Sequence, residues 1–301
     1  MTLPDDSFIE PRQLHAIRKQ VEKALKAADA IGRYPTPVSD VMEAARISVS
    51  EEQVLDERFL KRARRKAKSG LKKALSKIIG LFDVVARLVY IDYTIIKVKQ
   101  TFLKLHETAH AVLPWQRDIY GAIEDCEKTL DPDISEMFDR EANVFASDVL
   151  FQLDDFTKQV ADLPFSIKVP LKYSSKYGAS VYATIRRYVS TNHRACAVIV
   201  IDPPIIKECN GFTANLRRVV TSTNFEMSFG VLRWPNQFTP NDQIGAMIPI
   251  GRKMSGTRSI SLRDSNNTLH ECIAEAFATP YHVFILVHYI KTLKKTTIFM
   301  Q

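Results

Sequence analysis

The spacing of apolar residues changes along this chain, and the change limits the folds that the chain can adopt. Up to about Pro164, apolar residues recur every three or four positions, which is the period of an amphipathic helix. Residues 11–31 show this most clearly, with one apolar stripe formed by Leu14, Ile17, Val21, Leu25 and Ala28. From Ala195 onward, short aliphatic and β-branched runs predict strands instead. We therefore expect an α+β fold, with a helical first part and a sheet in the last third.

The same patterns place the other elements. Helices are expected at residues 41–46, along the basic run near residue 70, at 95–112 and at 132–153. Two short helices are expected within residues 169–190, around a turn at Gly178. Strands are expected at residues 81–91, 195–202, 244–250, 258–264 and 282–290, and a further helix at 269–279.

A length of 301 residues predicts two or three domains, at roughly 100–200 residues per domain. The changes in pattern place the boundaries at residues 1–160, 161–192 and 193–301. An apolar content of 46% is enough to fill hydrophobic cores, which argues against a disordered chain.

Cysteine usage and hydropathy predict a cytoplasmic protein. The four cysteines, at positions 126, 196, 209 and 272, are far apart and form no CxxC pair, which argues against a disulfide framework or an all-cysteine zinc site. The first ten residues, MTLPDDSFIE, lack the basic and apolar parts of a signal peptide. No run approaches the roughly 18 apolar residues that cross a bilayer, so no membrane partner is expected.

The segment His106-Glu107-Thr108-Ala109-His110 is the candidate catalytic motif. On a helix, His106 and His110 lie one turn apart on the same face, so both imidazole rings can reach one metal ion. Glu107 follows the first histidine, where its carboxylate can take a proton from a metal-bound water and act as the general base. The simpler alternative is a helix that carries two unrelated histidines.

A catalytic zinc site uses three protein ligands and keeps one position open. The expected helix at 132–153 contains Asp139-Arg140-Glu141-Ala142-Asn143-Val144-Phe145-Ala146, whose alanines would let it approach the first helix closely. Glu141 is the predicted third ligand. The metal is expected to be Zn²⁺, although Mn²⁺ could occupy the same set of nitrogen and oxygen donors.

These two motifs resemble those of the ImmA/IrrE-type metallopeptidases, in which a short strand and a linker precede HExxH. About thirty residues later such proteins carry a helix that reads approximately E-x-E-A-x-x-F-A. Here the strand is residues 88–92, and the second motif begins with Asp139 where the family usually has Glu. The resemblance covers roughly residues 31–149. It implies a mainly helical zincin-like metallopeptidase domain, with His106, His110 and Glu141 as zinc ligands and Glu107 as the base.

The longer members of that family, the IrrE radiation-response regulators, append a helix-turn-helix-like unit and a GAF-like sensor domain. Residues 161–192 resemble the first, and residues 193–301 resemble the second more loosely. The resemblance implies a site-specific endopeptidase that cleaves a helix-turn-helix transcriptional repressor and so derepresses stress genes, including those of the DNA-damage response.

Two other functions stay open. A DNA-binding regulator with a structural or inactive metal site could use Arg186 and Arg187, with Thr184, on a recognition helix. It could also use the run between Lys61 and Lys77, which holds nine basic residues. The simpler alternatives are a helix pair that only packs and a solvated basic face. The last third could bind a small molecule, although its histidines, His193, His270, His282 and His288, are scattered.

Overall fold

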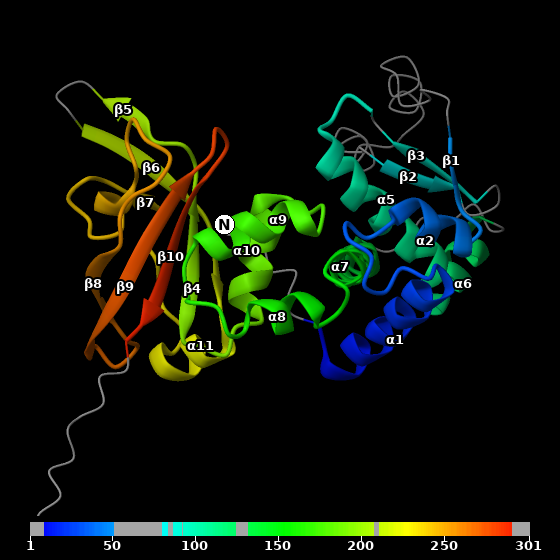
Figure 1. Ribbon diagram of the computed structural model, residues 1–301, viewed down its shortest axis with the longest axis horizontal. Coiled ribbons are helices and arrows are strands. Elements are labelled where there is room, and N and C mark those ends of the chain that lie inside the picture. The colour runs from blue at the N-terminus through cyan, green and yellow to red at the C-terminus, as the bar shows by residue number, and fades with distance from the viewer. Residues whose placement is uncertain are drawn as a thin grey trace, which may run out of the picture. The chain divides into compact units, whose positions relative to one another are not determined.

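The computed structural model describes residues 9–50, 80–83, 87–91, 93–124, 132–207 and 211–290. The basic run between Lys61 and Lys77 and the helix expected there lie outside these residues. Backbone contacts divide the chain into two compact units (Figure 1). We call Asp5–Val160 with Lys172–Ala183 the helical unit, and Ala161–Leu171 with Thr184–Gln301 the sheet unit.

Helices dominate the helical unit, with one small sheet. Its elements are α1 (Pro11–Ala27), α2 (Val38–Ala44), β1 (Ser48–Val49), β2 (Gly80–Asp83), β3 (Leu88–Ile91), α5 (Lys97–Val112), α6 (Pro114–Glu124), α7 (Pro132–Leu150) and α8 (Asp155–Val160). The sheet has the order β1-β3-β2, with β1 parallel and β2 antiparallel to β3. The strands expected near residues 81–91 are thus confirmed as two.

Helices α5 and α7 pack along one another and form the centre of the helical unit. Small residues make this close approach possible, because Ala109 on α5 and Ala142 and Ala146 on α7 are fully buried. Helix α5 ends at Val112, and the next residue, Leu113, is extended because a proline follows it. Pro114 then occupies the first position of α6, where its missing N–H costs nothing. The helices expected around residues 95–112 and 132–153 are confirmed.

The sheet unit is built on one antiparallel sheet with the order β5-β6-β4-β10-β9-β8, and β7 pairs with β6. Its elements are β4 (Cys196–Ile201), β5 (Ile205–Lys207), β6 (Gly211–Thr221), α11 (Thr223–Phe229), β7 (Gln237–Phe238), the 3₁₀ helix η1 (Gly245–Met247), β8 (Arg258–Arg263), β9 (Leu269–Ala278) and β10 (Val283–Tyr289). The central strand β4 is buried at every position. The chain as a whole is a mixed α+β fold, as expected.

Two expected elements of the sheet unit are wrong. Residues 269–279 were expected to be helical, but Leu269–Ala278 is the strand β9, because Cys272, Ala274 and Ala276 alternate into the core and tertiary packing outweighs helix propensity. Residues 244–250 were expected to be a strand but contain η1. A β-carbon at Gly245 would lie 1.8 Å from the backbone oxygen of Thr239, so this segment turns tightly against another part of the chain.

Helices α9 (Lys168–Lys176) and α10 (Val181–Ser190) confirm the two short helices expected within residues 169–190. Gly178 lies between them with a positive φ of 61°, a conformation that favours glycine. The boundary between the two units falls inside both helices. Nothing tests the three-part division at residues 160 and 192, which stays a prediction.

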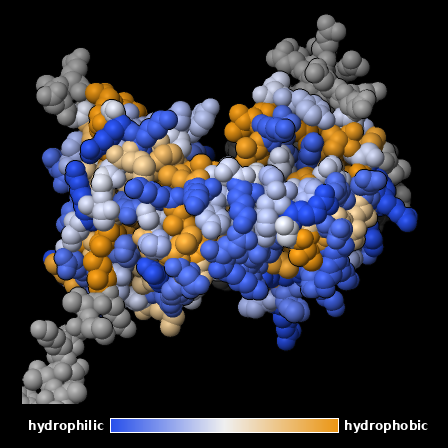
Figure 2. All heavy atoms as spheres, viewed as in Figure 1, coloured by the Kyte–Doolittle hydropathy of each residue, from blue (hydrophilic) through white to orange (hydrophobic). Residues whose placement is uncertain are grey.

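Apolar side chains also reach the surface of both units, as Figure 2 shows for one face. Val231 and Met227 of the sheet unit are 89% and 79% exposed, whereas Ile31 and Ile96 of the helical unit are 58% and 64% exposed. Scattered exposure of this kind is ordinary for folded proteins. Within the described residues, no helix has the length and apolar character needed to cross a membrane.

Candidate metal centre

Helix α5 brings His106 and His110 together at the face that packs against α7. Their four-residue spacing gives one helical turn, and their Nε2 atoms lie 3.3 Å apart, with the rings edge to face. His110 is 6% exposed, and the side chain of His106 is 14% exposed. The predicted pair is therefore adjacent and shielded from water.

The carboxylate beside the two histidines belongs to Asp139 of α7. Its Oδ1 atom is 3.7 Å from His106 Nε2, and the donor atoms of His106, His110 and Asp139 all lie within 4.8 Å of one another. Asn143, one turn further along α7, places its Oδ1 atom 3.1 Å from His106 Nδ1. Residues 139 and 143 are four positions apart, so both lie on the face of α7 that meets the histidines.

Glu141, the predicted third ligand, does not belong to this group. It is two residues after Asp139, which turns its side chain by about 200° around the helix axis. Its carboxylate is 1% exposed and accepts hydrogen bonds from Trp115 Nε1 at 2.7 Å, Gln116 Nε2 at 2.6 Å and Gln13 Nε2. The resemblance implied the glutamate of the motif as a ligand, whereas the carboxylate that lies beside the two histidines is that of Asp139.

Several residues near the histidines were not predicted as part of the site. Gln116 of α6 is fully buried, and its Oε1 atom is 2.7 Å from His110 Nδ1. The ring of Tyr120, also on α6, lies edge to face with His110 at 5.4 Å between centroids. The i,i+4 spacing of Asp139 and Asn143 was a usable signal in the sequence. Nothing in the sequence indicated that α6 would fold back onto α5.

The donor set fits a metal ion of the zinc type, which takes imidazole nitrogen and carboxylate oxygen ligands. Both histidines have an amide oxygen against Nδ1, from Gln116 for His110 and from Asn143 for His106. An imidazole that donates from Nδ1 carries a bare Nε2 lone pair. The Nε2 atoms of the two histidines are 3.3 Å apart and the Asp139 carboxylate lies beside them, so all three donor atoms face one position that a cation could occupy. This group could therefore hold a metal.

Burial dominates the electrostatics of the site. It raises the pKa of Glu107 to about 7, and the charge of Asp139 acts in the same direction while His106 opposes it. Burial also lowers the pKa of His110, and repulsion from a charged His106 adds to this effect. For His106, burial lowers the pKa, but the hydrogen bond that the ring donates to Asp139 and the charge of Glu107 together outweigh it, so the net shift of the pKa is upward.

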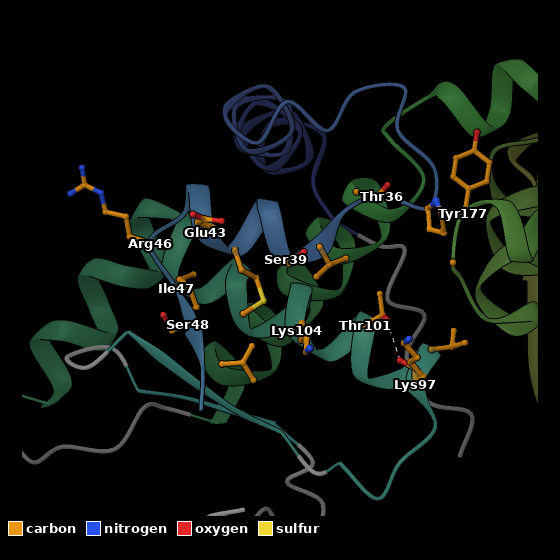
Figure 3. Close-up of a pocket in the computed structure, with 16 residues that line it drawn as sticks. Thr36, Ser39, Glu43, Arg46, Ile47, Ser48, Lys97, Thr101, Lys104 and Tyr177 are labelled. Atoms are coloured by element: carbon orange, nitrogen blue, oxygen red, sulfur yellow. Dashed lines mark hydrogen bonds between the residues drawn. The ribbon is translucent and has the colours of Figure 1, made fainter. Parts of the chain in front are cut away.

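A separate groove of about 980 Å³ lies on a different face of α5 (Figure 3). Its lining comes from α2, β1, the first half of α5 and the turn at Gly178. Lys97, Thr101 and Lys104 of α5 contribute to it, whereas neither His106 nor His110 does. Lys104 and His106 differ by about 200° around the helix axis, which explains why the groove and the metal centre do not merge.

Of the three residues predicted to read DNA, one is buried and two are half-buried. Thr184 is fully buried, so it is not available to contact a base. Arg186 and Arg187 are half-buried, and both already interact with other residues. In the sheet unit, His270 pairs with Asp264, with 2.9 Å between Nε2 and Oδ2. Burial lowers the pKa of His282 and of His288. The histidines of the last third do not converge on a site within the described residues.

No protein-family model matches this sequence, and no curated protein matches it. Among solved structures, the chain is similar to one described as a Mycobacterium tuberculosis transcriptional regulator, with a TM-score of 0.53 and 11% sequence identity. The match covers 98% of this chain and 95% of that chain. At this identity the likeness shows the fold alone. Membership of the ImmA/IrrE family stays a prediction from the two motifs.

Proposed function

We propose that the helical unit is a zinc-dependent endopeptidase that acts in transcription regulation by cleaving a helix-turn-helix repressor. The observation that carries the proposal is the group of His106, His110 and Asp139 beside the buried Glu107. We assign Asp139 as the third ligand in place of Glu141. The motif resemblance supports the substrate class. The similar solved structure is described as a transcriptional regulator, which is consistent with a regulatory role.

A zinc ion held by these three residues would supply Lewis-acid polarisation of a peptide carbonyl and of water. Glu107, which follows the first histidine on α5, removes a proton from the attacking water and returns it to the leaving amine. Gln116 and Asn143 hold the two imidazole rings through their Nδ1 atoms. Burial raises the pKa of Glu107 to about 7, which is in the range where a general base works best.

The proposal is tested with the full chain and its Glu107→Gln variant, each supplied with zinc or manganese. Both proteins are incubated in a lysate of the source organism, and new protein N-termini are identified by mass spectrometry. We expect a new N-terminus inside a helix-turn-helix repressor with the parent chain and none with the variant. Identical profiles for the two proteins, with metal bound to the parent, would refute the peptidase.

A second candidate is a DNA-binding regulator in which the metal centre is structural. The description of the similar solved structure favours it, and so do the paired helices α9 and α10. The buried Thr184 weighs against base reading by α10. This function predicts a salt-dependent shift of DNA in a gel that Glu107→Gln leaves unchanged and Arg186→Ala weakens. If Arg186→Ala leaves the DNA shift unchanged as Glu107→Gln does, and cleavage is observed, the peptidase is favoured.

A further inference from the structure

We propose that Glu141 and Gln116 form a relay that holds His110 in the tautomer able to bind a metal through Nε2. The inference rests on the proposed metal site and adds two positioning residues to it. It also gives Glu141 a role other than that of a ligand. The argument follows the hydrogen bonds outward from the buried carboxylate of α7 to the imidazole ring on α5.

The carboxylate of Glu141 is fixed by donors from two other helices. Gln13 of α1 donates to its Oε1 atom, and Trp115 of α6 donates to its Oε2 atom at 2.7 Å. Gln116 Nε2 donates to the same Oε2 atom at 2.6 Å. A carboxylate can only accept from these groups. The side-chain atom that Gln116 turns toward Glu141 must therefore be its NH₂ group.

The orientation of the Gln116 amide then determines the proton on His110. Gln116 Nε2 also donates to the backbone oxygen of Phe138 at 3.2 Å, so its Oε1 atom is left to face His110 Nδ1 at 2.7 Å. A carbonyl oxygen accepts only, and a neutral imidazole carries one N–H. The proton of His110 is thus on Nδ1, and the lone pair of Nε2 faces His106 and the proposed metal position.

Burial makes this arrangement strict. Gln116 is fully buried, Glu141 is 1% exposed and His110 is 6% exposed. If the Gln116 amide were reversed, water could not replace the hydrogen bonds that it would lose. By contrast, the Asn143 amide that faces His106 Nδ1 is only half-buried, and His106 is therefore held less firmly than His110. Outer-shell partners of metal-bound histidines commonly fix the tautomer in this way.

The decisive variant is Gln116→Met, which roughly keeps the length of the side chain and removes the acceptor at His110 Nδ1. The proton of His110 is then no longer held on Nδ1 and can occupy Nε2, where it blocks the metal. We expect zinc affinity to fall about 10- to 100-fold, as measured by competition with a chromophoric chelator.

Two changes at position 141 test the part played by the carboxylate. Glu141→Leu removes an acceptor of the Gln116 amide, which then keeps only the Phe138 oxygen, so we expect a smaller loss of zinc affinity. In Glu141→Gln the remaining oxygen can still accept from Trp115 and Gln116 while the new NH₂ group faces Gln13, whose amide can reverse, so zinc affinity should stay close to that of the parent. The control outside the relay is Glu136→Gln, a change at an exposed acid of α7, and its zinc affinity should equal that of the parent.

Nitrogen-15 NMR of the metal-free protein reads the tautomer directly. We expect the proton of His110 on Nδ1 in the parent, in Glu141→Gln and in the Glu136→Gln control, and a mixture of the two tautomers in Gln116→Met. If Gln116→Met does not fold, Glu141→Leu is measured instead, since it should move both readouts in the same direction. Neither readout needs a substrate, so failure of the peptidase proposal would leave this result standing. Parent-like zinc affinity and an unchanged tautomer in Gln116→Met or in Glu141→Leu would overturn the relay.

Discussion

The two units differ in what they bury. Among the described residues, the buried acidic and histidine side chains are in the helical unit, namely Glu107, His110, Glu141 and Asp148. The buried polar residues of the sheet unit are hydroxyl-bearing only, namely Thr184, Thr213, Ser222 and Ser255. Burying a charge costs free energy that burying a methyl group does not. Glu107 and Glu141 lie next to the two histidines or are linked to them through Gln116, so the helical unit carries this cost at its candidate site, whereas the sheet unit does not.

The sharpest test of this contrast is Glu107→Gln. We expect peptide cleavage to fall by about 10²–10⁴-fold, because the general base is lost. We also expect the thermal midpoint to stay the same or rise, since a neutral amide replaces a buried carboxylate at a position that is 8% exposed. Calorimetry alongside the cleavage assay measures both. A clear fall in the midpoint would mean that Glu107 contributes to packing and would weaken the contrast.

Removing core volume from the sheet unit should lower the stability of the protein without changing its metal site. Phe229 of α11 is 1% exposed, stacks on Phe225 with 4.4 Å between ring centroids, and contacts His270 and Tyr289 edge to face. Phe229→Ala should cost about 3–5 kcal/mol in the free energy of unfolding. Denaturant unfolding measures this loss. Zinc affinity should not change, and a parallel loss of zinc affinity would show that the two units are energetically coupled.

Asp139 and Glu136 offer a matched pair on α7. Both are exposed acids, at 58% and 57% of their side-chain surface, but only Asp139 lies near the histidines, whereas Glu136 pairs with Arg140. Asp139→Ala should lower zinc affinity by more than the roughly 10- to 100-fold expected for an outer-shell residue. Glu136→Ala should leave it unchanged. Equal zinc affinity in the two variants would remove Asp139 from the ligand set.

The smallest expected effect concerns two thiols of the sheet unit. Burial raises the pKa of Cys196 and of Cys272 to about 12, so at pH 8 only about one thiol in 10⁴ is ionised. In a Cys126→Ser, Cys209→Ser variant, which retains only these two thiols, a disulfide reagent should react slowly until denaturant is added. The rate should rise about tenfold per pH unit while the fold is intact. Fast reaction of the native protein at pH 8 would contradict the tight packing of this unit.

Local pattern predicted much of the helical unit. The apolar stripe of residues 11–31 became α1, with Ile17, Val21 and Leu25 buried. The HExxH helix and the alanine-rich face of α7 also formed as expected, because their signals span two or more turns. The wrong predictions concern segments whose secondary structure depends on the strands that lie beside them in space. Residues 269–279 contain alanine and glutamate, which favour a helix, yet pairing with β8 and β10 makes them a strand.

The candidate site likewise has one part that the sequence predicted and one part that depends on helix packing. Sequence spacing alone placed His106 and His110 on one helical face, since a four-residue interval fixes that geometry in any helix. The choice of a third carboxylate required the rotation of α7 against α5, which brings Asp139 and Asn143 to the histidines and turns Glu141 to the other side. The sequence itself contained both acids and could not rank them by orientation.

The sequence by itself determined which segments are amphipathic and which residues have metal-binding chemistry, because both properties depend on side-chain type and on distance along the chain. Only the tertiary structure decided that α6 places Gln116 between His110 and Glu141, and that Ala274 lies in a strand and not in a helix. These outcomes depend on contacts between segments far apart in sequence. A contact of that kind leaves no periodic signal in either partner, and its free energy arises only when the two surfaces meet.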